Sequence, residues 1–522
     1  MKTLTLREKI GQLIVAGFPA PSLTEDLKRL IRDYKIGNVI LFSHNIENKQ
    51  QLRSLCDELQ SSITEHTGYP ALISIDQEGG RVTRLPADAS NVPGAMAIAS
   101  TGRPENAYAA GRLTARELRA LGVNFNLAPV LDINNNKLNP VINVRAYGDT
   151  AETVETYGLQ MMNGLRDGGV LTAVKHFPGH GDTAVDSHLG LPTIDKTLEE
   201  LLELELKPFQ AAIDAGAEGL TIAHILYPRI EPERVPATMS RAIVTDLLKM
   251  KMGYRGLVIS DCLEMDAIKK YYGTANGALG ALQAGVHQVF VSHSAQLVIE
   301  TVETIENAVA SGELAMSVLD EAVQEVLRWK EKYGRVETDE LSVVGCEDHC
   351  RAIAAISEES ICLVRGSLAP VRKGDASDTF FVGSTPYRTD LASSVARTDL
   401  NFPATMGKAF SAAHALIGID PDDGEIERTV ALIESGRHTR VVIGLYNGRE
   451  NAGQLKLANR LIANGLRVTA VALGKPYDLE LLEGEFCGLA AFEYTSLALV
   501  SLVRILGGEV VPTGRLSVAG ER

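Results

Sequence analysis

Short apolar runs rich in Val, Ile and Leu alternate with longer segments of helical period over the first 330 or so residues. This alternation is typical of repeated β-α units, in which parallel strands are joined by crossover helices. Eight runs fit the length of a strand, at residues 14–18, 39–43, 71–76, 125–130, 173–177, 220–224, 257–261 and 288–292. Eight units close a barrel, and no glycine-rich phosphate loop of an open doubly wound sheet follows the first run. The pattern therefore predicts an α/β fold with a (β/α)8 TIM-type barrel.

Most of the predicted strands end in a polar or charged side chain. These side chains are Ser43, Asp76, Lys175 with His176, His224, Asp261 and Ser292. The carboxyl ends of barrel strands converge on one face, and that face holds the active site in barrel enzymes. We therefore expect these side chains to gather around a single site.

The chain continues well beyond the barrel. It has 522 residues, whereas a barrel typically takes about 250. A helix predicted at 318–333 closes the barrel domain (1–335), and the polar segment 336–346 is predicted to be a linker. A second domain should then occupy 347–522.

The second domain has its own α/β pattern. Two apolar runs at 440–446 and 466–473 are predicted to be buried strands, with an amphipathic helix at 454–464 between them. We expect a small α/β sandwich that carries no catalytic cluster of its own.

Composition and charge narrow the range of partners. The net charge of −15 argues against nucleic acid and anionic membranes, which repel an acidic protein. No apolar stretch reaches the roughly 20 residues that span a bilayer, and residues 1–12 show no apolar core of a secretory signal. Six scattered cysteines suit a reducing compartment. A cytoplasmic location is the resulting expectation.

Asp261 is the candidate nucleophile. A carboxylate at a strand end can attack a substrate carbon as a nucleophile, while a second group protonates the leaving atom. Asp261 ends an apolar strand, so the barrel should fix its backbone. The alternative is that Asp261 only caps the helix that follows.

His188 and Asp186 are the candidates for acid/base catalysis. They lie two positions apart in a loop that contains Gly179, Gly181 and Gly190. A carboxylate at this spacing can accept a hydrogen bond from one ring nitrogen and orient the ring. The alternative is an ordinary Asp-His contact in a surface loop.

Two groups of side chains raise the question of a metal. His176, His180, Asp182, Asp186 and His188 fall within thirteen positions, but without a recognised metal-binding spacing and with Lys175 adjacent. Cys346, His349 and Cys350 have no second ligand pair nearby and are predicted to lie in a surface loop. We expect neither a metal nor a cofactor.

Several long motifs occur in order along the predicted strands. They are Lys175-His-Phe-Pro-Gly-His-Gly, Asp186-Ser-His, Asp76-Gln-Glu-Gly-Gly-Arg-Val, and Ser260-Asp followed by Leu263-Glu-Met. Together they resemble glycoside hydrolase family 3, in particular its bacterial β-N-acetylglucosaminidase branch. The resemblance covers the first 330 residues. It implies that Asp261 is the nucleophile and that Asp186 and His188 form the acid/base pair.

The same resemblance implies a substrate-binding set that holds the hydroxyl and acetamido groups of a terminal N-acetylglucosamine. The set consists of Asp76, Arg84, Arg145, Lys175 and His176. Carboxylates accept from sugar hydroxyls while Lys and Arg donate to them, so the residue types suit the task. For Arg84 and Arg145, a structural ion pair is the alternative.

The chain departs from the family pattern in two places. Cys262 stands where this branch commonly has a second aspartate after the nucleophile. The added domain carries Pro476-Tyr-Asp-Leu and Glu493-Tyr-Thr, which resemble the second domain of two-domain members. We expect that domain to stabilise the barrel or to border the substrate.

The resulting expectation is a retaining exo-β-N-acetylglucosaminidase that acts on muropeptide or chitin-type fragments, as in peptidoglycan recycling. Positions 260 and 262 carry no carboxylate, so attack by the substrate's own acetamido group is disfavoured. The alternatives are a glycoside phosphorylase of the same fold, since a neutral histidine does not repel phosphate, another β-glycosidase such as a β-glucosidase, and a non-catalytic carbohydrate-binding protein.

Overall fold

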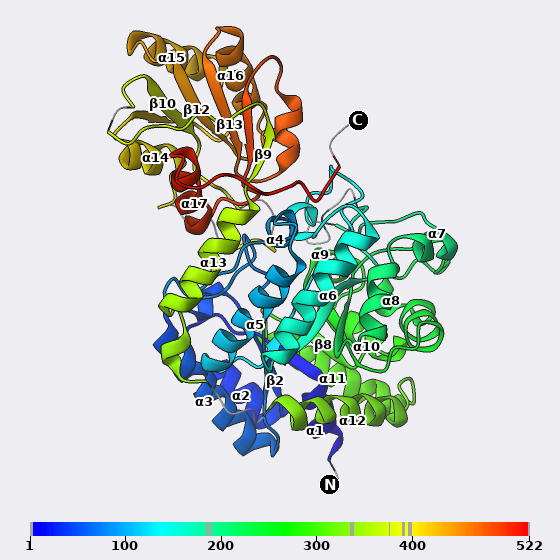
Figure 1. Cartoon of the computed structure of the whole chain (residues 1–522). Coiled ribbons are helices and arrows are strands. Elements are labelled where there is room, and N and C mark those ends of the chain that lie inside the picture. Colours follow the sequence, from blue (N-terminus) through cyan, green and yellow to red (C-terminus); the bar gives the residue numbers. More distant parts are fainter. Residues whose placement is uncertain are drawn as a thin grey trace.

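The protein consists of a barrel and a smaller α/β part that sits on one end of it (Figure 1). The computed structural model describes residues 4–183, 186, 190–334, 339–374, 376–388, 392–394 and 399–519. Eight parallel strands close the barrel in chain order, so the predicted TIM-type fold is confirmed. The strands are β1 (Ile14–Ala16), β2 (Asn38–Leu41), β3 (Leu72–Ile75), β4 (Phe125–Asn126), β5 (Leu171–Phe177), β6 (Gly219–Ile222), β7 (Leu257–Cys262) and β8 (Gln288–Val291).

Every predicted barrel run contains a strand, and the largest difference lies in β4, which is much shorter than the predicted 125–130. Proline 129 falls in this run and has no N–H to donate to a neighbouring strand. Pairing resumes just beyond it, where Leu131 N donates to Lys175 O at 2.6 Å. The peptide bond that follows Lys175 is cis.

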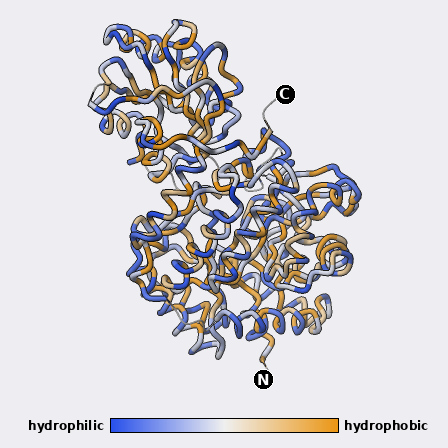
Figure 2. Tube along the Cα trace, in the orientation of Figure 1, coloured by the Kyte–Doolittle hydropathy of each residue, from blue (hydrophilic) through white to orange (hydrophobic). Residues whose placement is uncertain are grey.

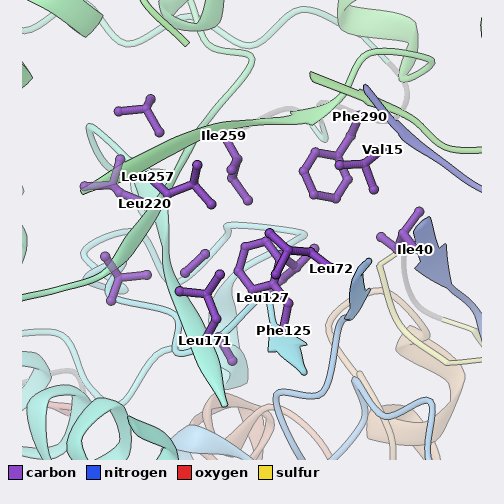
Figure 3. Packing of buried hydrophobic residues seen from close by; sticks show 14 of the residues in the cluster. Val15, Ile40, Leu72, Phe125, Leu127, Leu171, Leu220, Leu257, Ile259 and Phe290 are labelled. Carbon is purple, nitrogen blue, oxygen red and sulfur yellow. The ribbon is translucent and has the colours of Figure 1, made fainter. Parts of the chain in front are cut away.

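Apolar side chains from the strands fill the inside of the barrel. Phe125, Ile259 and Phe290 are at most 2% exposed and pack toward one another across the interior (Figure 3). The inside is therefore a packed core, as in other barrels of this kind. Any ligand site must lie at an end of the barrel.

An outer ring of helices surrounds the strands, and along them hydrophilic and hydrophobic residues alternate (Figure 2). In α3, for example, Leu52, Leu55, Leu59 and Ile63 are buried at helical spacing. The ring and its short additions are α1 (Leu6–Leu13), α2 (Glu25–Tyr34), α3 (Lys49–Thr67), α4 (Ala95–Ser100), α5 (Pro104–Ala120), α6 (Ala151–Asp167), α7 (Leu198–Glu203), α8 (Lys207–Asp214), η4 (Ala242–Lys251), α9 (Asp266–Lys269), α10 (Thr274–Ala284), α11 (Ala295–Ser311) and α12 (Met316–Tyr333).

The second part is built on a six-stranded sheet with the order β11-β10-β12-β13-β14-β9. Its strands are parallel except β9, which runs antiparallel to β14. The elements are α13 (Glu347–Ser360), β9 (Cys362–Arg365), β10 (Thr379–Gly383), α14 (Phe402–Phe410), β11 (Ala413–Leu416), α15 (Asp423–Ser435), β12 (Arg440–Leu445), α16 (Ala452–Ala463), β13 (Arg467–Ala472), β14 (Cys487–Ala490) and α17 (Ser496–Leu506). The predicted strand-helix-strand unit is thus present as β12, α16 and β13.

Helix α13 connects the two parts, packing on α4 and α5 of the barrel and on α17 of the second part. His349 on this helix bonds Glu117 of α5, with Nδ1 2.7 Å from Oε1. The predicted surface loop around Cys346 and Cys350 is therefore wrong, because Cys346 caps α13 and Cys350 lies inside it. The four-residue spacing of Cys346 and Cys350, which also occurs in metal sites, is here the spacing of residues along one helix.

Within the described part of the chain, no helix is both long and apolar enough to cross a bilayer.

Lys330 offers a test of this architecture. Its side chain on α12 is buried beneath the barrel and donates to Gln12 Oε1 at 2.6 Å and to Gly37 O at 2.8 Å. Burial lowers the pKa of Lys330 to about 7, whereas a lysine in the unfolded chain titrates near 10.4. Between these values the unfolded chain binds the extra proton, so stability rises with pH.

We therefore expect wild-type protein to gain stability relative to Lys330→Met as the pH rises from 7 to 9. Thermal unfolding of both proteins at several pH values measures this difference. Parallel Tm curves over that range would show that Lys330 stays charged in the folded protein.

Candidate active site

A pocket of about 600 Å³ opens at the carboxyl ends of the barrel strands. Six of the eight sequence-predicted site residues line it, namely Asp76, Arg84, Arg145, Lys175, His176 and Asp261. The polar strand ends Ser43 and Ser292 line it as well. His224 is the exception among the strand ends, since its buried ring bonds Thr238 and the carbonyl of Cys262 instead. The expected convergence of strand ends is otherwise confirmed.

Glu78 lies at the centre of the charges on one wall of the pocket. Arg145 binds both of its carboxylate oxygens, at 2.8 and 2.7 Å, and Lys175 Nζ lies 2.7 Å from Glu78 Oε1. Lys175 also donates to Asp76 Oδ1 at 2.7 Å. Arg145 therefore forms the structural ion pair that was the alternative to sugar binding, and it also lines the pocket. Two carboxylates and two cations form one connected group.

Glu78 and Lys175 are ionised in the folded protein. Burial alone would raise the pKa of Glu78, but Arg145 and Lys175 hold it well below its usual range. Burial likewise opposes the charge on Lys175, and Asp76 and Glu78 together raise its pKa. The group therefore presents fixed charges to a ligand around neutral pH.

His176 is oriented from behind by Asp132. The ring nitrogen Nδ1 of His176 lies 2.6 Å from Asp132 Oδ2, and Asp132 Oδ1 accepts the backbone N–H of His180 at 2.7 Å. Asp132 is fully buried, and His176 holds its pKa below the ordinary value despite burial. His176 lines the pocket, and its other ring nitrogen, Nε2, lies 3.5 Å from Arg145 Nη2.

Asp261 lies near the end of β7, on the pocket wall. Its Oδ1 accepts the backbone N–H of Cys262 at 2.7 Å, and His224 Nε2 lies 3.0 Å from the Cys262 carbonyl. Burial raises the pKa of the Cys262 thiol to about 12, so the residue after Asp261 is neutral. A second aspartate at that position would have placed a further negative charge beside Asp261.

The loop predicted to carry the acid/base pair is described only in part. His188 lies outside the described residues, so its contact with Asp186 stays a prediction. Asp186 itself is buried and is not among the residues that line the pocket. The start of the loop is fixed by Asn139, whose amide donates to the carbonyls of His180 and Gly181 at 2.8 and 2.9 Å.

Arg84 is bound by the second part of the chain. Its Nη2 donates to Ala392 O at 2.8 Å and its Nη1 to Ser394 Oγ at 3.2 Å. Ser394 also accepts from the N–H of Thr83 at 2.9 Å. Arg388, Ala392 and both neighbouring serines line the pocket. The second part therefore borders the site.

Among the residues considered as a metal cluster, His180 and Asp182 have separate partners. His180 bonds Thr183, and Asp182 pairs with Lys196. Among the described residues, no group of three or more His, Cys, Asp or Glu is arranged to hold a metal ion.

Two central residues were not singled out by sequence reasoning. Glu78 lies within the motif that begins at Asp76, and its role follows from partners 67 and 97 positions away. Asp132 lies just beyond a predicted strand end. Position after a strand could have indicated Asp132, whereas its pairing with His176 depends on the folded barrel.

Comparisons with known proteins agree with this geometry. The family model of the glycosyl hydrolase family 3 N-terminal domain matches residues 5–329. The structure of a family 3 β-N-acetylglucosaminidase from Paenibacillus sp. has a TM-score of 0.91 at 36% identity, with 99% of each chain covered. A β-glucoside phosphorylase with a TM-score of 0.81 is 21% identical and shares the fold.

Curated relatives match mainly over the barrel. The chain is 38% identical over 281 residues to β-hexosaminidase A of Pseudoalteromonas piscicida, a match that covers 51% of this chain and 47% of that protein. It is 36% identical over 294 residues to a β-hexosaminidase of Methylococcus capsulatus, covering 56% of this chain and 86% of that one. On the match to the family model and the agreement of the whole fold, the chain belongs to glycosyl hydrolase family 3.

Proposed function

We propose that the protein is a retaining exo-β-N-acetylglucosaminidase that removes terminal β-linked N-acetylglucosamine. The observation that carries the proposal is the meeting of Asp261 with the Asp76, Glu78, Arg145 and Lys175 group in one pocket. The barrel interior beneath this pocket is packed, so a substrate reaches Asp261 only from the open side of the pocket.

In the proposed reaction, Asp261 attacks the anomeric carbon and the bond to the leaving oxygen breaks. Protonated His188 gives its proton to that oxygen, while Asp186 orients the ring and stabilises its positive charge. Neutral His188 then takes a proton from water, the resulting hydroxide attacks the anomeric carbon, and Asp261 is released. The two displacements together retain the β configuration.

The fixed charges bind the sugar in this proposal. Asp76 accepts hydrogen bonds from hydroxyl groups, and Lys175, His176 and Arg145 donate them. Arg84 supports the adjoining wall through its bonds to the second part of the chain. All donors and acceptors are oriented before substrate arrives, which lowers the cost of ordering the site on binding.

We further propose that the substrates are short fragments of cell wall or chitin that carry a terminal N-acetylglucosamine, processed in the cytoplasm. The pocket exceeds the volume of one sugar ring, so a second unit can lie near its mouth. The relatives named β-hexosaminidase support the sugar identity.

Activity on a matched pair of aryl β-glycosides tests the proposal. We expect release of the aryl group from the N-acetylglucosaminide at least 100-fold faster than from the glucoside, with free N-acetylglucosamine as product at every phosphate concentration. Sugar 1-phosphate that rises with phosphate would instead identify a phosphorylase. Equal rates on the two glycosides would contradict the proposed sugar identity.

Asp132→Asn tests the orientation of His176. Loss of the carboxylate weakens the 2.6 Å contact that orients the ring, and misplaced substrate groups typically cost on the order of 10- to 100-fold in kcat/KM. We expect a loss in this range, seen mainly as a higher KM. Asp195→Asn, which removes an exposed ion pair with Arg229, is the control and should leave kcat/KM unchanged. Equal kinetics for both variants would remove Asp132 from the account.

A further inference from the structure

Glu493 is a buried carboxylate of the second part that lies behind the sugar site. It follows β14 and is 5% exposed. Its Oε2 accepts the backbone N–H of Gly94 at 2.8 Å, and its Oε1 accepts the hydroxyl of Thr495 at 2.8 Å. Both partners are neutral, and among the described residues it forms no ion pair. Burying a carboxylate without a cation costs free energy of folding, so its presence here calls for a specific explanation.

The backbone next to Glu493 is also unusual. Phe492 is 2% exposed and has a φ of +64°, in the left-handed region that bulky side chains rarely adopt. Such a conformation persists only where the surroundings fix it, and it sets the direction in which the backbone enters the following residue. Here the following residue is Glu493, whose side chain reaches into the barrel part.

Glu493 packs against the turn that carries Glu78. A Cβ atom placed on Gly80 would lie 2.8 Å from Glu493 Oε2, and one placed on Gly94 would lie 3.4 Å from it. Gly79 and Gly80 both have positive φ and directly follow Glu78. A larger residue at position 80 would therefore displace the carboxylate.

Glu493 and the charged group of the pocket line the same small cavity. Its volume is about 20 Å³, enough for about one water molecule. Glu78, Arg145, Gly94 and Glu493 are among the residues that line it. The carboxylate of the second part thus borders the same small space as the ion pair of Glu78 and Arg145.

We propose that Glu493 is a positioning residue of the sugar site, through which the second part of the chain fixes the 78–80 turn and, with it, the ion pairs of Glu78. The proposal rests on the proposed function only for its kinetic readout. Glu493 touches no substrate in this account and acts through Glu78, Arg145 and Lys175.

Substitutions at position 493 separate positioning from simple stabilisation. Glu493→Gln keeps an oxygen for the Gly94 N–H and nearly the same volume, so kcat/KM on the aryl N-acetylglucosaminide should stay within about threefold of wild type. Glu493→Ala and the shorter Glu493→Asp lose the contact, and kcat/KM should fall about 10- to 100-fold. Should the alanine variant not fold, the Asp and Gln variants still decide the question.

His349→Ala is the matched control. It removes another buried bond between the two parts, the one to Glu117, and neither residue lines the pocket. It should lower Tm and leave kcat/KM within about twofold of wild type. A loss of kcat/KM in this control equal to that of Glu493→Ala would mean that general loosening of the two parts explains both.

A double variant tests the route through Glu78. If Glu493 acts by placing Glu78, then Glu493→Ala combined with Glu78→Gln should be within about twofold of Glu78→Gln alone. Losses that multiply would show that the two residues act independently and would overturn the proposal.

Hydrogen exchange supplies a readout that does not depend on activity. In Glu493→Ala, amide exchange should rise in peptides covering 78–84 and 94–97, whereas in His349→Ala it should rise around α13 only. Unchanged exchange at 78–84 would overturn the proposal. If the wild-type protein is inactive but Glu493→Ala still shows the expected rise in exchange, the proposed function is refuted and the positioning role remains supported.

Discussion

The neutralisation of the buried Glu78 carboxylate by Arg145 and Lys175 is the constraint on which the site depends. A charge removed from water is tolerated only when its partners are close and well placed. Glu78 follows β3, Arg145 follows β4 and Lys175 lies within β5, so their meeting requires the closed barrel. The packed interior of the barrel makes the required geometry stable, and Asp76 and Asp261 then join the same pocket.

The second part of the chain belongs to this arrangement. The segment around Ser394 bonds the 83–84 backbone and Arg84, and Glu493 reaches the Gly79-Gly80 turn from another side. The pocket is therefore formed by two folding units. In this way the second part bears on the geometry of the pocket at the end of the barrel.

Much of the fold follows from hydrophobic patterning, because a buried parallel strand leaves an apolar run between polar ends. The short β4 shows the limit of this signal, since Pro129 interrupts a run whose composition is that of a strand. The cysteines at 346 and 350 show another limit, because a helical spacing and a metal-binding spacing look alike in sequence. Packing of α13 against the barrel decides between them.

The site residues also fall into those that the sequence could predict and those whose roles it could not. Asp76, Lys175, His176 and Asp261 could be predicted because they end strands and stand in long motifs. The roles of Glu78 and Asp132 could not be predicted, because these roles consist of bonds to residues far along the chain. Arg84 was predicted to bind sugar, and its bonds to Ala392 and Ser394 depend on a contact between two domains that no local pattern encodes.

The proposed mechanism requires a covalent bond between Asp261 and the sugar. A fluorinated N-acetylglucosamine derivative that forms the glycosyl-enzyme quickly and hydrolyses slowly would trap this state, and digestion with mass spectrometry would locate the label. We expect the added mass on the peptide that contains Asp261, and no labelling of Asp261→Asn. A label on any other residue would rule out Asp261 as the nucleophile.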